Sequence, residues 1–153
     1  MSAEIILPAG APEEVVTNAL VRDIDLAAFG GKGTMALITL DNGHDHNRPN
    51  TFGPQSVKAL DAAITDAIGR NPAAIAITGK PFIFAAGADL SALSFLNDRN
   101  QALAIGKLGH DVFRRLGESS IPTFAFINGL ALGGGLEVGL HCHYRTVSST
   151  AFT

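Results

Sequence analysis

The chain has 153 residues, of which 46% are hydrophobic and 16% charged, and its net charge is -3. This is enough material for one globular domain with a real core. The mild acidity and scattered basic residues argue against a nucleic-acid partner. No apolar run approaches the ~18 residues of a membrane span, and the start of the chain lacks the basic residues of a signal peptide.

The single cysteine, Cys142, cannot form an internal disulfide, which fits the reducing cytoplasm. We therefore expect a cytoplasmic protein. Cys142 lies in a segment that resembles a strand, where a buried packing role explains it better than a role as catalytic thiol.

The first part of the chain predicts two strands. Residues 1–14 carry prolines, a glycine and acidic residues, and we expect a loose lead-in there. β-Branched and apolar residues predict an outer strand over 15–26, and a glycine-rich turn over 27–34 follows it. A clear strand over 35–40 then ends in a polar loop that runs to Pro49.

Helical spacing of apolar residues predicts a helix over 54–68, with Pro54 in its first turn. Residues 74–78 form a short apolar strand of the buried kind. The order β-β-α-β indicates a layered α/β domain. We expect a short helix over 90–96 and a longer one over 102–116, whose apolar side carries Leu103, Ile105, Leu108, Val112, Phe113 and Leu116.

Two His-x-His pairs occur, His44 with His46 and His141 with His143. Alternate residues on a strand share a face, so either pair could contribute to a metal site. No further His or carboxylate falls at a convincing spacing. We therefore expect no metal.

The most informative stretch runs from Asn128 to Glu137 and reads N-G-L-A-L-G-G-G-L-E. An apolar strand over 123–127 leads into it, and a helix-compatible run over 136–140 follows. A helix that begins at a glycine turn has unpaired N–H groups, which a ligand oxygen can approach closely and which favour negative charge. Glu137 lies about one turn further on, so its carboxylate can face the same point. A tight turn followed by a capping glutamate explains the same residues.

A similar unit occurs upstream over residues 79–90, where a strand, a small-residue turn and an expected helix start follow one another. Asp89 suits an N-cap or a first-turn acid. The N–H of Ala88 would be a free donor beside Gly87, although an ordinary strand-to-helix turn also fits this segment. Two such N–H groups aimed at one point make an oxyanion hole.

Two segments, Phe84–Leu90 and Asn128–Glu137, resemble the signature segments of the enoyl-CoA hydratase/isomerase (crotonase) superfamily, and Arg48–Phe52 is similar to that family too. The resemblance covers about residues 35–153 and implies an α/β fold of the ClpP/crotonase type, a layered β-β-α spiral. Residues 1–34 would be the lead-in and first outer strand. The stretch from Leu140 to Arg145 is similar to the hydratase part of multifunctional β-oxidation proteins.

The resemblance implies an enoyl-CoA hydratase, which adds water in syn fashion to 2-trans-enoyl-CoA during fatty-acid β-oxidation. The substrate would be a coenzyme A thioester, with no further cofactor. Its thioester oxygen would bind the N–H groups of Ala88 and Gly134, and Glu137 would be one of two catalytic glutamates beside a water. The residues implied to line the substrate are Ala86, Gly87, Ala88, Asp89, Leu90, Ser91, Gly133 and Gly134. The full-length protein would form a homotrimer, a hexamer or part of a multifunctional complex.

The chain departs from the family after Glu137, because no other Asp or Glu follows before Thr153. The second glutamate and the later helices are therefore missing, and we expect an N-terminal part of a hydratase with little activity alone. An isomerase or another family reaction would use the same oxyanion hole. A non-catalytic acyl-CoA-binding module is a further alternative. A relative of the serine peptidases is disfavoured, because no serine lies at either glycine turn.

Overall fold

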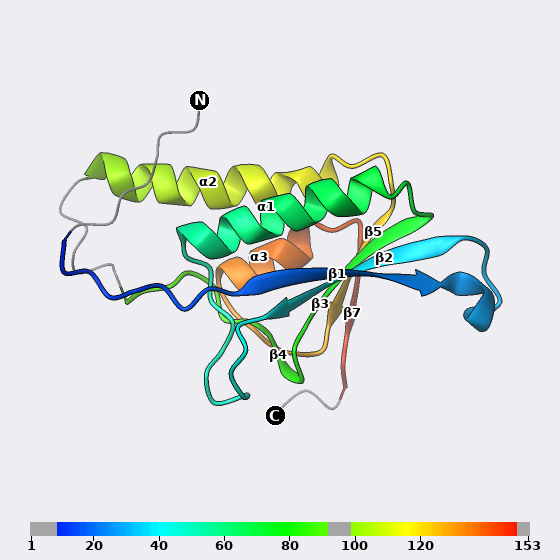
Figure 1. Ribbon diagram of the computed structural model, residues 1–153, viewed down its shortest axis with the longest axis horizontal. Coiled ribbons are helices and arrows are strands. Elements are labelled where there is room, and N and C mark those ends of the chain that lie inside the picture. Colours follow the sequence, from blue (N-terminus) through cyan, green and yellow to red (C-terminus); the bar gives the residue numbers. More distant parts are fainter. Residues whose placement is uncertain (1–8, 92–98, 150–153) are drawn as a thin grey trace.

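Strands and helices alternate along the chain, and the computed structural model describes residues 9–91 and 99–149. Figure 1 shows the helices gathered on one side of the strands. The main sheet contains β1 (Asn18–Asp25), β2 (Thr34–Asp41), β3 (Ala74–Gly79), β5 (Thr123–Ile127) and β7 (Tyr144–Val147). The predicted order β-β-α-β is confirmed for the first half of the chain.

The strands of the main sheet lie in the order β1-β2-β3-β5-β7. β1 is antiparallel to β2, whereas the other neighbours are parallel. Parallel strands under helices bury both faces, which explains the apolar run of β3. Between β1 and β2 lies a short 3-10 helix, η1 (Leu26–Phe29), in the stretch predicted as a turn.

A second, two-stranded sheet pairs β4 (Phe82–Ala85) with β6 (Gly129–Ala131) in parallel. The strands approach so closely that a Cβ on Gly129 would lie 2.0 Å from the carbonyl oxygen of Phe82. This close pairing brings the two glycine segments of the sequence side by side.

Two long helices cover the sheet. α1 (Pro54–Gly69) begins at the predicted proline and buries Val57, Leu60 and Ile64 of its predicted apolar side, whereas Ile68 is 38% exposed. The buried residues of α2 (Arg99–Gly117) are Val112, Phe113 and Leu116 in its second half, and Leu103 in its first half is 55% exposed. Fewer apolar residues of α2 are therefore buried than the sequence pattern predicts. The short helix α3 (Gly134–His141) completes the layer.

Three predictions about local structure are wrong. Leu90 and Ser91 are not helical, and the rest of the predicted helix over 90–96 lies outside the described residues. Cys142 caps the end of α3 instead of lying in a strand, although its predicted burial is confirmed. His141 and His143 do not share a strand face, because His141 lies in the last turn of α3.

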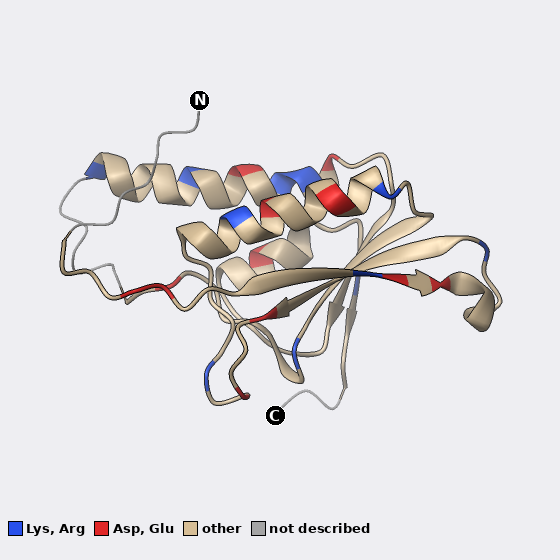
Figure 2. Cartoon of the chain, viewed as in Figure 1, with Lys and Arg blue, Asp and Glu red and all other residues tan. Residues whose placement is uncertain are grey.

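Charged side chains of both signs are interspersed along α1 and α2 (Figure 2). Arg115 of α2 pairs with Asp61 of α1, and Arg70 pairs with Asp66 and with Asp23 of β1. Exposed pairs of this kind stabilise a fold by roughly 0–1 kcal/mol each. Hydrophobic packing therefore dominates the contact between helices and sheet. None of the helices in the described parts of the chain has both the length and the apolar composition needed to cross a membrane.

The start of α1 is capped from the lead-in. The N-cap residue, Gly53, offers no side chain, and the carboxylate of Glu14 instead accepts hydrogen bonds from the N–H groups of Gln55 (2.9 Å) and Ser56 (2.8 Å). A Cβ on Gly53 would lie 2.4 Å from the carboxyl carbon of Glu14, so a larger residue there would require the Glu14 side chain to shift. A carboxylate at a helix N-terminus also interacts favourably with the helix dipole.

We expect Glu14→Ala to lower the free energy of unfolding by about 1 kcal/mol, because two N–H groups lose their acceptor. Urea unfolding followed by circular dichroism measures this change. Glu13→Ala is the matched control and should change stability by less than about 0.5 kcal/mol, because Glu13 is exposed. Equal effects of the two substitutions would contradict the capping role.

Burial makes Cys142 a packing residue. The side chain is 3% exposed, and burial raises the pKa of its thiol to about 12. The reactive thiolate is therefore scarce in the folded chain at pH 8. We expect a thiol reagent to label native protein at least tenfold more slowly than urea-unfolded protein, with mass spectrometry as the readout. Equal labelling rates would show that Cys142 is accessible.

Candidate active site

The second glycine segment forms the corner between β6 and α3. Gly133, which precedes the helix, has φ 48° and ψ −126°, a conformation that only glycine adopts readily. The carbonyl of Gly133 accepts a hydrogen bond from the N–H of Glu137 at 3.0 Å. The N–H of Gly134, the first residue of α3, has no partner among the described residues. This corner therefore presents one free donor at the start of a helix.

The three consecutive glycines meet different requirements. Gly133 needs its positive φ, and a Cβ on Gly135 would lie 2.0 Å from the carbonyl oxygen of Ala85. A Cβ on Gly134, in contrast, would meet its nearest atoms only at 3.6–3.8 Å, an ordinary contact distance. The backbone geometry of a tight turn thus requires glycine at Gly133 and Gly135. It does not explain why residue 134 is also glycine, since a Cβ would fit there.

The first glycine segment forms the corner after β4. Phe52 donates a hydrogen bond to the carbonyl of Gly87 (2.7 Å) and accepts one from the N–H of Asp89 (3.0 Å), which makes a parallel bridge between Phe52 and Ala88. In such a bridge the middle residue directs its own N–H away from the partner. The N–H of Ala88 has no partner among the described residues, so it is a second free donor.

The two corners touch through their backbones. The N–H of Leu132 donates to the carbonyl of Ala85 at 3.0 Å. A Cβ on Gly87, whose φ is 98°, would lie 3.0 Å from the nitrogen of Gly134 and 3.0 Å from the carbonyl oxygen of Leu132. Gly87 and Gly134 therefore lie in direct contact, which brings the segments carrying both predicted donors together.

Glu137 faces the same corner. One of its carboxylate oxygens lies 3.8 Å from the position of a Cβ on Gly134. The side chain is exposed and accepts no hydrogen bond from the described residues. A capping glutamate would bond the N–H groups at the start of its helix. The geometry thus favours an unengaged acid beside Gly134 over the capping interpretation.

Three of the other predicted substrate residues, Asp89, Leu90 and Ser91, follow Ala88 in the chain. Asp89 accepts a hydrogen bond from the N–H of Ser91 at 2.9 Å, and both residues line a cavity of about 260 Å³. Leu90 is 66% exposed. The lead-in and the loop before α1 line the same cavity through Pro12, Glu13, Val15, Asn42, Arg48, Pro49 and Thr51. No pattern in the sequence indicates that the lead-in lines this cavity.

Two asparagines that hold the corners also carry no sequence signal strong enough to assign them a role. The side chain of Asn50, fully buried, donates to the carbonyls of Leu40 (2.9 Å) and Phe84 (3.1 Å). The side chain of Asn128 exchanges hydrogen bonds with Gly79 and donates to the carbonyl of Lys80. Each asparagine ties a strand end of the small sheet to the main sheet. The position of Asn128 directly after an apolar strand was an available clue, whereas Asn50 lies within a loop and had none.

The histidine pairs have structural partners or lie apart from the corners. His143 bonds Thr123 and the carbonyl of Gly117 through its two ring nitrogens. His46 packs edge-on against Phe82, with 6.1 Å between the ring centroids. Within the described residues no group of three or more His, Cys, Asp or Glu could hold a metal ion.

Residues 30–152 match the family model described as enoyl-CoA hydratase/isomerase. The chain belongs to the enoyl-CoA hydratase/isomerase family. It is 38% identical over 116 residues to the fatty acid oxidation complex subunit alpha of Shewanella frigidimarina, and the match covers 74% of this chain and 16% of that subunit. The same subunit of Shewanella oneidensis is 37% identical over 121 residues, covering 78% and 17%. The chain thus spans about one sixth of the length of the curated relatives it matches.

Solved structures share the fold of this chain. Pseudomonas aeruginosa DspI superposes with a TM-score of 0.71 at 27% identity, covering 94% of this chain and 54% of that one. An enoyl-CoA hydratase/isomerase from Xanthobacter autotrophicus gives a TM-score of 0.74 at 22% identity, covering 90% and 48%. The predicted crotonase-like α/β fold is confirmed, and the chain corresponds to about half of each of these structures.

The glycine segment can be tested by stability. We expect Gly135→Ala to cost about 3 kcal/mol or more, because its methyl group would overlap the backbone of Ala85. Gly134→Ala should change stability by less than about 1 kcal/mol, because a Cβ there meets only ordinary contacts. Urea unfolding of both variants measures the difference. Similar losses for both would mean that Gly134 is held by packing alone.

Proposed function

We propose that this chain carries the thioester-binding part of an enoyl-CoA hydratase site, with Ala88 and Gly134 as oxyanion-hole donors. The observation that supports the proposal is the contact between Gly87 and Gly134 with the unengaged carboxylate of Glu137 beside it. Backbone donors beside an acid suit a reaction in which negative charge develops on a carbonyl oxygen. The family membership and the likeness to fatty acid oxidation subunits suggest an acyl-CoA as the carrier of that carbonyl.

In the proposed reaction, water adds across the double bond of a 2-trans-enoyl-CoA. A glutamate removes a proton from water as its oxygen bonds to C3, and the electron pair of the double bond moves onto the thioester oxygen. The N–H groups of Ala88 and Gly134 stabilise that oxyanion by roughly 3–4 kcal/mol each. A proton delivered to C2 then returns the electron pair and forms the 3-hydroxyacyl-CoA. No cofactor is needed beyond the coenzyme A of the substrate.

Glu137 is one of two acid–base groups that this reaction uses. The chain spans about one sixth of the length of its curated relatives, and we propose that the second group belongs to a part of the protein outside these 153 residues. We therefore propose that the 153 residues alone have little or no hydratase activity. A complete protein would act as an oligomer or within a fatty acid oxidation complex, as the names of the curated relatives suggest.

Isomerisation of the double bond is the second candidate, and the family description names both activities. It would use the same donors to stabilise a dienolate, with the second acid–base group placed to move a proton between carbons. A chain that only binds acyl-CoA is less well supported, because binding alone needs no free carboxylate beside Gly134.

We expect Glu137→Gln, in a chain extended past Thr153 through its own reading frame, to slow hydration of crotonyl-CoA about 10²–10⁴-fold. The fall in absorbance of the conjugated enoyl thioester measures the rate. Glu118→Gln is the matched control, since Glu118 is exposed and pairs only with Arg114 among the described residues. An unchanged rate in Glu137→Gln would remove this residue from the mechanism.

A further inference from the structure

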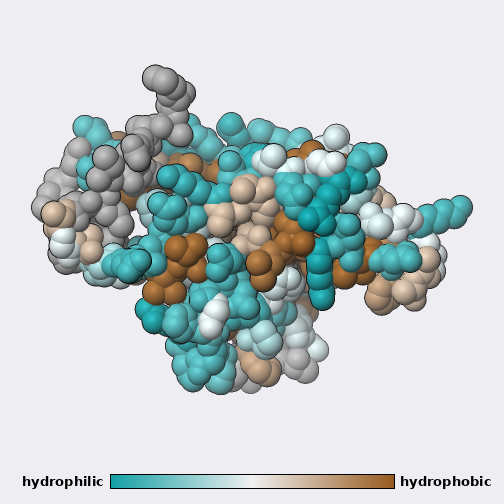
Figure 3. Space-filling model, in the orientation of Figure 1, coloured by the Kyte–Doolittle hydropathy of each residue, from teal (hydrophilic) through white to brown (hydrophobic). Residues whose placement is uncertain are grey.

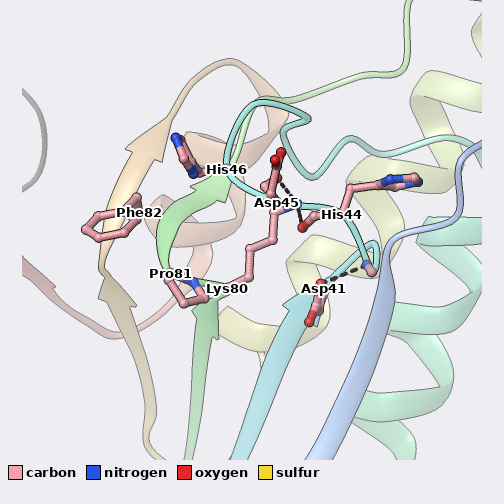
Figure 4. A pocket seen from close by; sticks show the side chains of 8 residues that line it. Asp41, His44, Asp45, His46, Lys80, Pro81 and Phe82 are labelled. Atoms are coloured by element: carbon pink, nitrogen blue, oxygen red, sulfur yellow. Dashed lines mark hydrogen bonds between the residues drawn. The ribbon is translucent and has the colours of Figure 1, made fainter.

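Lys80 is a buried cation with an unusual set of partners. It follows β3 and is 4% exposed. Its ammonium donates to the carbonyl oxygens of His44 (2.7 Å), Asp45 (2.9 Å) and Arg48 (2.7 Å), and to the side-chain oxygen of Asn42. Figure 4 shows the Lys80 side chain reaching toward the loop that carries Asp45 and His44.

The loop depends on this cation. Three carbonyl groups of one loop converge on a single point, and their dipoles repel one another unless a positive charge lies between them. Buried carbonyl oxygens without a donor are costly. Burial lowers the pKa of Lys80, while the nearby carboxylates of Asp41 and Asp45 act in the opposite direction. The ammonium of Lys80 therefore supplies the positive charge that the converging carbonyl oxygens of this loop require.

A continuous set of hydrogen bonds runs from Lys80 toward the corner after β4. Asn42, held by Lys80, donates its backbone N–H to the side-chain oxygen of Asn50 at 3.1 Å. The carbonyl of Asn50 accepts a hydrogen bond from the N–H of Ala86 at 2.8 Å. Phe52, which lies two residues after Asn50, makes the bridge that sets the orientation of Ala88.

We propose that Lys80 is a positioning residue for the oxyanion hole, whose ammonium fixes the segment from Asn42 to Phe52 and thereby aims the N–H of Ala88. The inference rests on the proposed function of that N–H. The three ammonium hydrogens of Lys80 are shared among four oxygen atoms of one loop, which fits a role in holding that loop.

The test uses acetoacetyl-CoA, whose bound enolate absorbs in the near ultraviolet. The ratio of enolate to keto form of the bound ligand reports stabilisation of the oxyanion, does not depend on affinity, and requires no second acid–base group. We expect the 153-residue chain to raise this ratio above its value in water. Lys80→Ala should lower the ratio about tenfold, and n-propylammonium, which replaces the removed atoms, should restore it.

Lys80→Met fills most of the same space without charge and should also lower the ratio without recovering on addition of n-propylammonium. Lys58→Ala is the matched control, because Lys58 is exposed on α1, and should behave as the parent chain. Parent-like ratios in both Lys80 variants would overturn the positioning role. So would a loss of ligand binding in Lys80→Ala that n-propylammonium does not reverse. If the parent chain itself does not raise the ratio, the proposed oxyanion hole fails, and this inference fails with it.

Discussion

The site depends on a contact between two stretches of bare backbone. The corner after β4 and the corner before α3 approach until Gly87 and Gly134 touch, and Ala85 accepts a hydrogen bond from Leu132. A side chain at Gly87 or Gly135 would push the corners apart, so both positions require glycine. The small residues that let the two corners pack closely also leave the backbone N–H groups beside them uncovered by side chains. Close packing and exposed N–H donors therefore have the same physical cause.

Polar side chains hold these corners where strand ends would otherwise leave backbone groups unpaired. The fully buried Asn50 supplies two donors and one acceptor, and the half-buried Asn128, just before β6, also supplies two donors and one acceptor. Among the described residues no buried side-chain nitrogen or oxygen lacks a partner. Satisfied networks of this kind rigidify the structure around them. Lys80 extends the network outward to the loop before α1.

The sequence predicted the parts of the fold that follow from local pattern. The apolar spacing of α1 and the buried run of β3 were readable because burial repeats with the period of the element. The helix over 90–96 was predicted wrongly at its start, because Leu90 and Ser91 are not helical. The preceding residue, Asp89, is bonded through its N–H to the carbonyl of Phe52, a contact between residues far apart in the chain that local pattern does not reveal.

The same limit applies to the site. The glycine segments and Glu137 could be predicted as site residues because the residues that form each motif are adjacent in the sequence. The cap from Glu14 to α1 and the cradle of Lys80 could not, since each joins residues more than thirty positions apart. A lysine between a buried strand and a proline suggests a surface turn. Only the three-dimensional convergence of loop carbonyls shows why it is buried.

The position of Glu137 on α3 bears on whether the proposed reaction is hydration or isomerisation. One side of α3 packs on the sheet through Val138 and Gly139, while Leu136 and Leu140 are 42% and 58% exposed. Hydrophobic side chains also reach the surface between hydrophilic groups on the face shown in Figure 3. The carboxylate of Glu137 thus lies on the exposed side of α3. Under the proposed function, the groups that face this side of α3 would decide whether water is admitted beside the thioester. The two glycine corners would then determine how charge is stabilised, and the groups opposite Glu137 would determine which reaction uses that charge.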